Sequence, residues 1–226
     1  MIKRAAVYLF AVVATLLLGW QISLSLDSAK AFSYEHRVYM SFQSWYASHQ
    51  MPGEEEWQAQ EALILRAIAL QGRNASIKNT AGRLYEYRAY QFSPQSTALR
   101  MQYAEKAAAM YRLATHDSPM LVYPWMNLAL IKMKLGQWDQ EFFQAYRKAV
   151  MLGPWELAAM PVLVEIGLLV YPNMDGVSRQ FISAYIDRVA DGAGPMVGGQ
   201  LHNKPAMCWR LQQMGHPKAY ERICGT

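Results

Sequence analysis

An uninterrupted apolar run near the N-terminus most constrains where this chain can fold. From Ala5 to Leu26 the sequence reads AAVYLFAVVATLLLGWQISLSL, and none of these side chains is charged. As a helix rising about 1.5 Å per residue, the run extends about 33 Å, which is enough to cross a bilayer core of about 30 Å. The sequence therefore predicts a membrane anchor over residues 5–26.

The charges that flank this run predict its orientation. Lys3 and Arg4 come directly before it, and Asp27 comes directly after it. Because basic residues favour the cytoplasmic side, we expect a short cytoplasmic stub at the N-terminus. Everything from about Asp27 onward is then expected on the other side of the membrane.

A cleaved signal peptide is the alternative interpretation of the same segment. Ala29-Lys30-Ala31 has the small-x-small pattern of a cleavage site. However, the apolar run exceeds the usual length of about 7–15 residues, and Trp20 suits a membrane interface better than a cleavage region. These features favour an uncleaved anchor, and both interpretations export the chain.

The two cysteines of the chain, Cys208 and Cys224, both lie close to the C-terminus. In an oxidising compartment they could pair, and a bridge closing a loop of about fifteen residues contributes about 3 kcal/mol in the loop-entropy model. The alternative is two unrelated thiols, one buried and one at a frayed end. The sequence leaves both open.

Beyond the anchor, apolar residues recur at helical spacing, and the breaks between helices fall at Gly and Pro. This pattern predicts an all-α chain with a juxtamembrane segment at 27–53, a helical domain at 54–190, and a Gly-rich linker with a helical tail at 191–226. The expected helices cover residues 54–72, 76–90, 97–116, 121–135, 139–152, 155–171, 177–190, 205–214 and 218–223. The apolar stretch Leu157–Val170 is too short for a second span and contains Glu165 and a kinking Pro161, so we interpret it as a core helix.

A repeat of small and aromatic residues runs through this helical domain. Tetratricopeptide units of about 34 residues place small residues where two helices approach and aromatic residues where they interlock. The matching positions are Ala67, Gly72, Gly82, Tyr85, Ala107, Tyr111, Ala114, Pro119, Trp125, Leu128, Ala129, Gly136 and Trp138. The spacing is one residue too long between Trp138 and Ala149, and a loop at 91–96 lengthens the middle unit. Over about residues 57–154 the chain therefore resembles a degenerate tetratricopeptide array of antiparallel helix pairs, with a plain helical bundle as the alternative.

Three short phrases carry a narrower resemblance. They are GRLYEYRA at 82–89, PWMNLAL at 124–130 and LGPWE at 152–156. In this order, after an N-terminal anchor, they resemble the VpsP-like proteins of bacterial exopolysaccharide gene clusters. The resemblance implies an accessory protein of polysaccharide synthesis or export in the bacterial inner membrane, with its helical domain in the periplasm. It implies envelope or polysaccharide-assembly proteins as partners, and it supplies no catalytic residues.

The first helix of each unit in such an array lines a concave groove. On this register, the predicted partner-binding residues are Asn79, Arg83, Glu86, Tyr87, Met126, Asn127 and Lys134. Their mixture of Arg, Tyr, amide and Met side chains suits a protein or peptide partner. The alternative for the neighbouring Leu130 and Met133 is that they simply pack inward. A polysaccharide bound directly by the groove, or by exposed Trp rings, is a second hypothesis for the function.

The chain contains no recognisable catalytic, cofactor or metal motif, and we expect neither an enzyme nor a cofactor. Glu54, Glu55 and Glu56 are interpreted as a solvated helix start, and a hydrolase using Glu86 and Glu165 is the enzymatic alternative.

The spacing of His202, Cys208, His216 and Cys224 does not match a structural zinc site. Trp125, Trp138 and Trp155 are interpreted as core or turn residues. The formal net charge of +5, with no Lys/Arg run, predicts no nucleic-acid partner.

Overall fold

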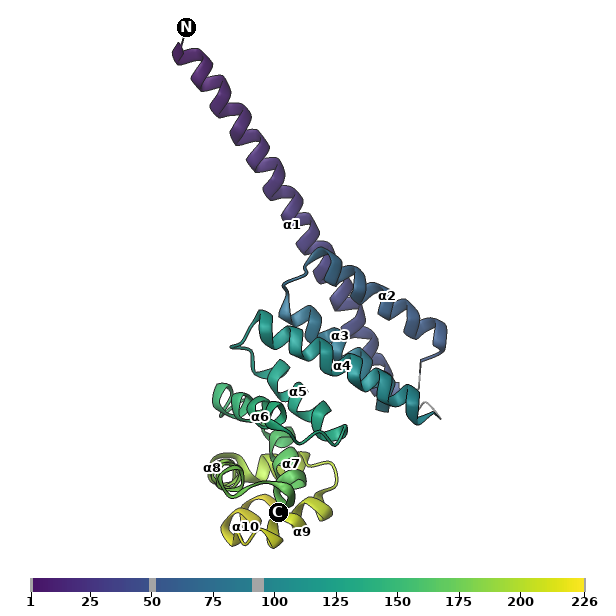
Figure 1. The fold of residues 1–226 in the computed structure, drawn as a ribbon, viewed down its shortest axis with the longest axis vertical. Coiled ribbons are helices and arrows are strands. Elements are labelled where there is room, and N and C mark those ends of the chain that lie inside the picture. Colours follow the sequence, from purple (N-terminus) through teal and green to yellow (C-terminus); the bar gives the residue numbers. More distant parts are fainter. Residues whose placement is uncertain (1, 49–51, 91–95, 226) are drawn as a thin grey trace.

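The computed structural model describes residues 2–48, 52–90 and 96–225, and every regular element in these ranges is a helix. The all-α prediction is therefore confirmed for the described chain. In order, the elements are α1 (Ile2–Ser48), α2 (Glu54–Leu70), α3 (Ala75–Tyr90), α4 (Thr97–Asp117), α5 (Val122–Lys134), α6 (Gln140–Leu152), α7 (Met160–Val170), η1 (Tyr171–Asn173), α8 (Gly176–Gln200), α9 (Lys204–Gln213) and α10 (Pro217–Cys224). Helix α1 projects from the body at one end, and α8–α10 lie at the other end (Figure 1).

Helix α1 is twice as long as the predicted anchor. Its 47 residues continue through the predicted juxtamembrane segment, because no Gly or Pro interrupts the sequence between Leu26 and Ser48. Within the described residues, its segment Val12–Trp45 is the one helix that is long and apolar enough to cross a membrane, with a mean hydropathy of 1.3. The large apolar side chains described between Phe10 and Leu26 are exposed, which is what a lipid-facing helix requires.

The C-terminal half of α1 belongs to the helical body. Ala31, Val38, Phe42 and Trp45 recur at helical spacing and are buried where α1 packs on α2 and α3. The juxtamembrane segment is therefore a wall of the domain rather than a connection to it.

Hydrogen bonds fix this half of α1 in place. The Nε2 atom of Gln71 donates to Ser28 Oγ at 2.9 Å, at the turn between α2 and α3. One oxygen of Glu35 accepts from the hydroxyls of Ser76 and Thr80 on α3, at 2.8 and 2.9 Å. These contacts hold α1 against the body from its first turn beyond the apolar run.

Successive helices pack as pairs, α1 with α2, α3 with α4, and α5 with α6. Gly82 on α3 lies against the ring of Tyr111 on α4, where an added Cβ atom would collide with the ring. Buried ion pairs join the same elements: Lys78 on α3 pairs with Asp117 at the end of α4. The position of Gly82 shows why the helix pair requires a small residue there.

Helix α7 is the core helix that the sequence predicts, but it begins later than expected. Leu163 and Val164 are fully buried, whereas residues 154–159 before the helix form turns. The predicted kink at Pro161 is wrong, because this proline lies in the first turn of α7, where no helical hydrogen bond to its nitrogen is needed.

The prediction of a Gly-rich linker at 191–199 is also wrong. These residues continue α8 to Gln200, with a local break at Ala193 (φ −147°). Gly194 and Gly198 lie directly against the backbone of Arg222 and Ile223 in α10, and a Cβ atom on Gly194 would stand 2.9 Å from the Arg222 carbonyl oxygen. The glycines therefore allow two helices to approach closely rather than loosening the chain.

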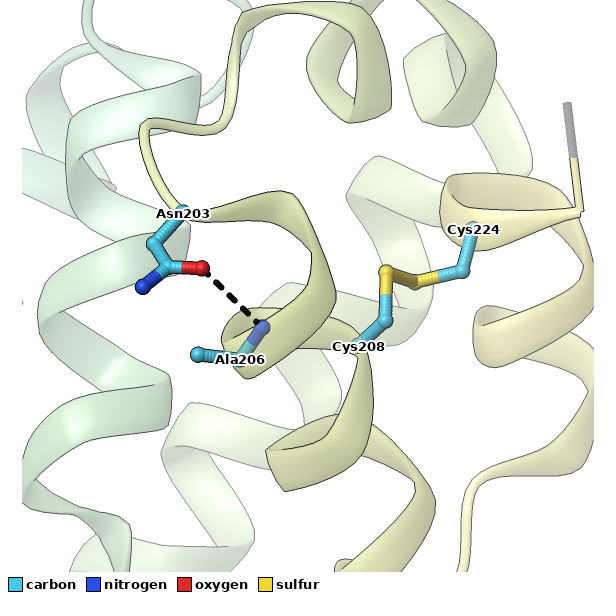
Figure 2. The surroundings of a disulfide bond; sticks show 4 residues. All are labelled: Asn203, Ala206, Cys208 and Cys224. Carbon is cyan, nitrogen blue, oxygen red and sulfur yellow. Dashed lines mark hydrogen bonds between the residues drawn. A yellow bond between two sulfur atoms is a disulfide. The ribbon is translucent and has the colours of Figure 1, made fainter.

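A disulfide between Cys208 on α9 and Cys224 on α10 closes the C-terminal hairpin (Figure 2). The two residues are 16 positions apart, with Cα atoms separated by 5.8 Å. Asn203 caps α9 by accepting from the Ala206 nitrogen at 3.3 Å. Of the two alternatives that the sequence left open, the structure has the paired one.

Candidate functional site

A cavity of about 910 Å³ opens on one side of the helical body. Its lining residues come from α1, α3 and α5, which are the first helices of the successive pairs, and from the turn before α7 and the first turn of α7. They are Phe32, Glu35, His36, Tyr39, Phe42, Gln43, Ser76, Asn79, Thr80, Arg83, Glu86, Tyr87, Tyr90, Tyr123, Met126, Asn127, Leu130, Lys134, Ala158 and Val162. We call this cavity the groove.

All seven residues predicted for partner binding line the groove. Four of them are on α3 (Asn79, Arg83, Glu86, Tyr87) and three on α5 (Met126, Asn127, Lys134). The structure thus brings the two predicted sets together in one cavity, while their role toward a partner stays a prediction. Tyr87, Met126 and Asn127 are mostly buried, with exposed fractions of 5, 8 and 7%, so their surface available to a partner is small.

One face of α1 forms a wall that the sequence reasoning missed. It carries six lining residues at spacings of three and four: Phe32, Glu35, His36, Tyr39, Phe42 and Gln43. The His36 ring stacks between Phe32 and Tyr39, at centroid distances of 6.0 and 6.5 Å. This helical spacing of aromatic residues was visible in the sequence and could have indicated the wall.

Polar contacts join the α3 and α5 sides of the groove. The Asn127 Nδ2 atom donates to Asn79 Oδ1 at 2.9 Å. Glu86 pairs with Lys134 at 2.6 Å and accepts from the hydroxyl of Tyr111 on α4 at 2.7 Å. Burial and the nearby Glu86 carboxylate raise the pKa of Tyr90, whose ring also contacts the Lys134 ammonium at 4.8 Å. Two of the predicted residues, Glu86 and Lys134, are therefore engaged with each other.

Arg83 differs from the other charged residues of the groove. Its guanidinium lies over the Phe42 ring at 5.4 Å. Within the described ranges, no carboxylate forms an ion pair with it, whereas Lys134 is paired with Glu86. Arg83 thus offers a guanidinium without an ion-pair partner to whatever enters the groove.

The acidic residues considered for catalysis have partners within the fold. Glu54 pairs with Arg88, and this hydrogen bond lowers the pKa of the Glu54 carboxyl. Glu56 accepts from the Trp45 indole at 2.7 Å, so these acids hold α2 against α3 and α1 rather than only beginning a solvated helix. Glu165 accepts from the His202 backbone nitrogen and does not line the groove that contains Glu86.

The four tail residues weighed as zinc ligands are held in separate contacts. His202 contacts Glu165, His216 contacts Asp187 at 2.9 Å, and both cysteines are in the disulfide. In the described part of the chain, no group of three or more His, Cys, Asp and Glu side chains is placed to hold a metal ion.

The three tryptophans interpreted as core or turn residues lie at or beside turns and connections rather than in the buried core. Trp125 donates to the Pro119 carbonyl oxygen at 2.9 Å and so locks a turn. Trp155 lies in a turn and Trp138 in the connection between α5 and α6, and both are outside the core, at exposed fractions of 56 and 44%. Trp155 covers Gly192, where the missing side chain leaves room for its ring.

In comparisons with models of known protein families and with curated proteins, the chain matches none. The function is therefore argued from the groove and from the helix that connects it to the apolar N-terminal segment.

Proposed function

We propose that this chain is a membrane-anchored helical scaffold that assists exopolysaccharide synthesis or export by binding envelope proteins in its groove. The N-terminus lies in the cytoplasm, residues 5–26 cross the inner membrane, and the helical body lies in the periplasm. Lys3 and Arg4 before the apolar run support this orientation. The disulfide supports it too, because such bonds persist in oxidising compartments.

We further propose that the body is a tetratricopeptide-like array. In such arrays the first helix of each pair lines the concave face, and most of the groove lining comes from α1, α3 and α5, with two residues at or just before the start of α7. The close contact of Gly82 with Tyr111 joins a small first-helix position to an aromatic second-helix position. Tyr146 and Ala149 on α6 are likewise fully buried.

The observation that carries the proposal is the groove itself. It combines exposed aromatic rings on α1 and α5 with amide groups and a guanidinium that has no ion-pair partner, which is the composition of a surface that recognises proteins. Tyr39 and Tyr123 are 42 and 41% exposed, so both rings are available to a partner.

Affinity isolation from detergent-solubilised membranes tests this function. The double variant Tyr39→Ala/Tyr123→Ala removes two of the exposed rings of the groove. Met40→Ala/Met101→Ala is the matched control outside the groove, at exposed fractions of 52 and 41%. We expect envelope or polysaccharide-assembly proteins to co-purify with the native chain and the control, and to fall at least tenfold with the double variant. Recovery of no such protein, or equal recovery with both variants, would contradict the proposal.

Direct binding of the polysaccharide by the groove is the second candidate function. The aromatic residues of the α1 wall favour it, because sugar rings stack on exposed aromatic faces. Calorimetry with the organism's own exopolysaccharide separates the two functions. Heat release that the Tyr39→Ala/Tyr123→Ala variant abolishes would favour the glycan, whereas no heat release removes this candidate.

A further inference from the structure

The groove begins very close to the end of the apolar run. Helix α1 passes without a break from Leu26 to the first groove residue, Phe32, which lies six positions further along. At about 1.5 Å per residue, the α1 wall from Phe32 to Gln43 extends from about 9 to about 26 Å beyond Leu26.

The height of the groove is fixed by the fold. Ala31 is fully buried, Gln71 binds Ser28, and Ser76 and Thr80 bind Glu35. The body is therefore joined to α1 directly beyond the span, with no flexible connection that would let it move away from the bilayer. A partner must present its binding segment at this same height.

The charges of the groove indicate what this segment carries. Lys134 pairs with Glu86. Glu35 keeps its negative charge, and its carboxylate is held toward α3 by the hydroxyl groups of Ser76 and Thr80. The Arg83 guanidinium has no ion-pair partner among the described residues and lies over the Phe42 ring of the α1 wall. A segment with an acidic side chain complements this arrangement.

We infer that the groove binds an extended, acidic juxtamembrane segment of another protein embedded in the same bilayer. This inference rests on the proposed function and names the partner class. At about 3.3 Å per residue, an extended chain leaving the bilayer reaches the groove within about three to eight residues. Confinement of both chains to one membrane raises the effective concentration of such a segment at the groove.

Site-specific photocrosslinking in intact membranes tests the inference with the full chain. A photo-reactive phenylalanine derivative replaces Tyr39 in the groove, and the same derivative at Met40 is the control on the adjacent, outward face of α1. Mass spectrometry then maps the crosslinked residue of the partner. We expect a crosslink from position 39 and not from position 40. The crosslinked residue should lie about three to eight positions from a membrane span of the partner and next to Asp or Glu.

A second variant lifts the groove away from the bilayer. Seven helix-forming residues inserted between Leu26 and Asp27 raise the body by about 10 Å and rotate it by only about 20°. The same seven residues between Ile2 and Lys3 are the control, because they leave the height unchanged. We expect the lifted chain to lose at least nine-tenths of the crosslink, or to shift it about three residues further from the partner's span.

A third pair of variants tests the charge. Arg83→Gln is expected to reduce the crosslink about tenfold, whereas Arg73→Gln, at an exposed position outside the groove, leaves it unchanged.

The outcomes separate this inference from the proposed function. A crosslink that keeps its yield and position after lifting, or that maps to a soluble protein, a second copy of this chain or a glycan, would overturn the juxtamembrane partner but leave a binding groove. An unchanged crosslink with Arg83→Gln would overturn its acidic character. The absence of any crosslink specific to position 39 would remove both the inference and the proposed function.

Discussion

At the scale of single residues, a few side chains determine how closely the helices approach. Gly82 and Tyr111 illustrate this, because the ring occupies the space where any other residue would place its Cβ atom. The sequence pattern predicted the two residues as parts of one repeat position, since small and aromatic residues alternate at that spacing. The charge contacts were less predictable, because Lys78 and Asp117 are 39 positions apart and meet only once α3 and α4 have packed.

Replacing Gly82 by Ala is expected to destabilise the domain by about 1–3 kcal/mol, because the added methyl group forces the Tyr111 ring to move. Chemical unfolding in detergent measures this change. Gly72→Ala is the control, since a Cβ atom there finds its nearest neighbour at 3.7 Å, and we expect a change within about 0.5 kcal/mol. Equal destabilisation by both variants would contradict the tight contact at Gly82.

The domain is expected to lose stability in acid. The Arg112 guanidinium, which donates two hydrogen bonds to Glu141 at 2.6 and 2.9 Å, lowers the pKa of that carboxyl from its ordinary value of 4.5. Lys78 likewise lowers the pKa of Asp117 from 3.8. Because the folded state holds these carboxylates ionised more strongly than the unfolded state, their stabilisation is present above pH 4.5 and is lost as the pH falls through the lowered values.

Unfolding midpoints measured between pH 7 and pH 3 check this dependence. We expect the unfolding midpoint to decrease once the pH is lower than 4.5. The decrease should be smaller in the Glu141→Gln variant, which lacks one of the titrating groups. A native midpoint that does not change down to pH 3 would contradict the assignment.

At the scale of elements, the sequence predicted the interior of the helices well and misjudged the segments around them. Apolar residues at helical spacing identified α2 to α7, because each of these helices buries one face. The continuation of α1 beyond Leu26 was missed, since its exposed polar residues conceal the buried positions Ala31 and Val38. The Gly-rich part of α8 was interpreted as a linker, because local propensity favours flexibility and only tertiary contact with α10 explains the glycines.

The disulfide is expected to stabilise the C-terminal hairpin. In the loop-entropy model, a bridge between residues 16 positions apart contributes about 3 kcal/mol, so Cys208→Ser/Cys224→Ser should lose about that much. Chemical unfolding of the native and variant chains, each with and without reductant, measures the loss. Reductant should shift the native chain to the variant's midpoint and leave the variant unchanged. A native midpoint that does not respond to reductant would contradict a stabilising disulfide.

At the scale of the whole molecule, one helix unites the apolar N-terminal segment with the groove. The sequence predicted seven groove residues on α3 and α5, because the repeat register assigned both helices to one face. The repeat register did not identify the α1 wall, since it began only at about residue 57; the helical spacing of aromatic residues on α1 was the signal that could have indicated it. The sequence could not indicate the partner's charge either. Arg83 differs from Lys134 only because Lys134 is paired with Glu86, and that pairing forms only in the folded chain.

The central claim is that the anchor holds a disulfide-closed helical body outside the cytoplasm, and one topology measurement tests it most directly. In one fusion, a reporter enzyme that is active only after export follows Thr226. In a second fusion, a fluorescent reporter that matures only in the cytoplasm takes the same place. Blotting determines the length of the chain. The account predicts a full-length, membrane-bound chain with an active exported reporter, a dark cytoplasmic reporter and no free thiol at Cys208 or Cys224. An active cytoplasmic reporter with both thiols free would contradict it.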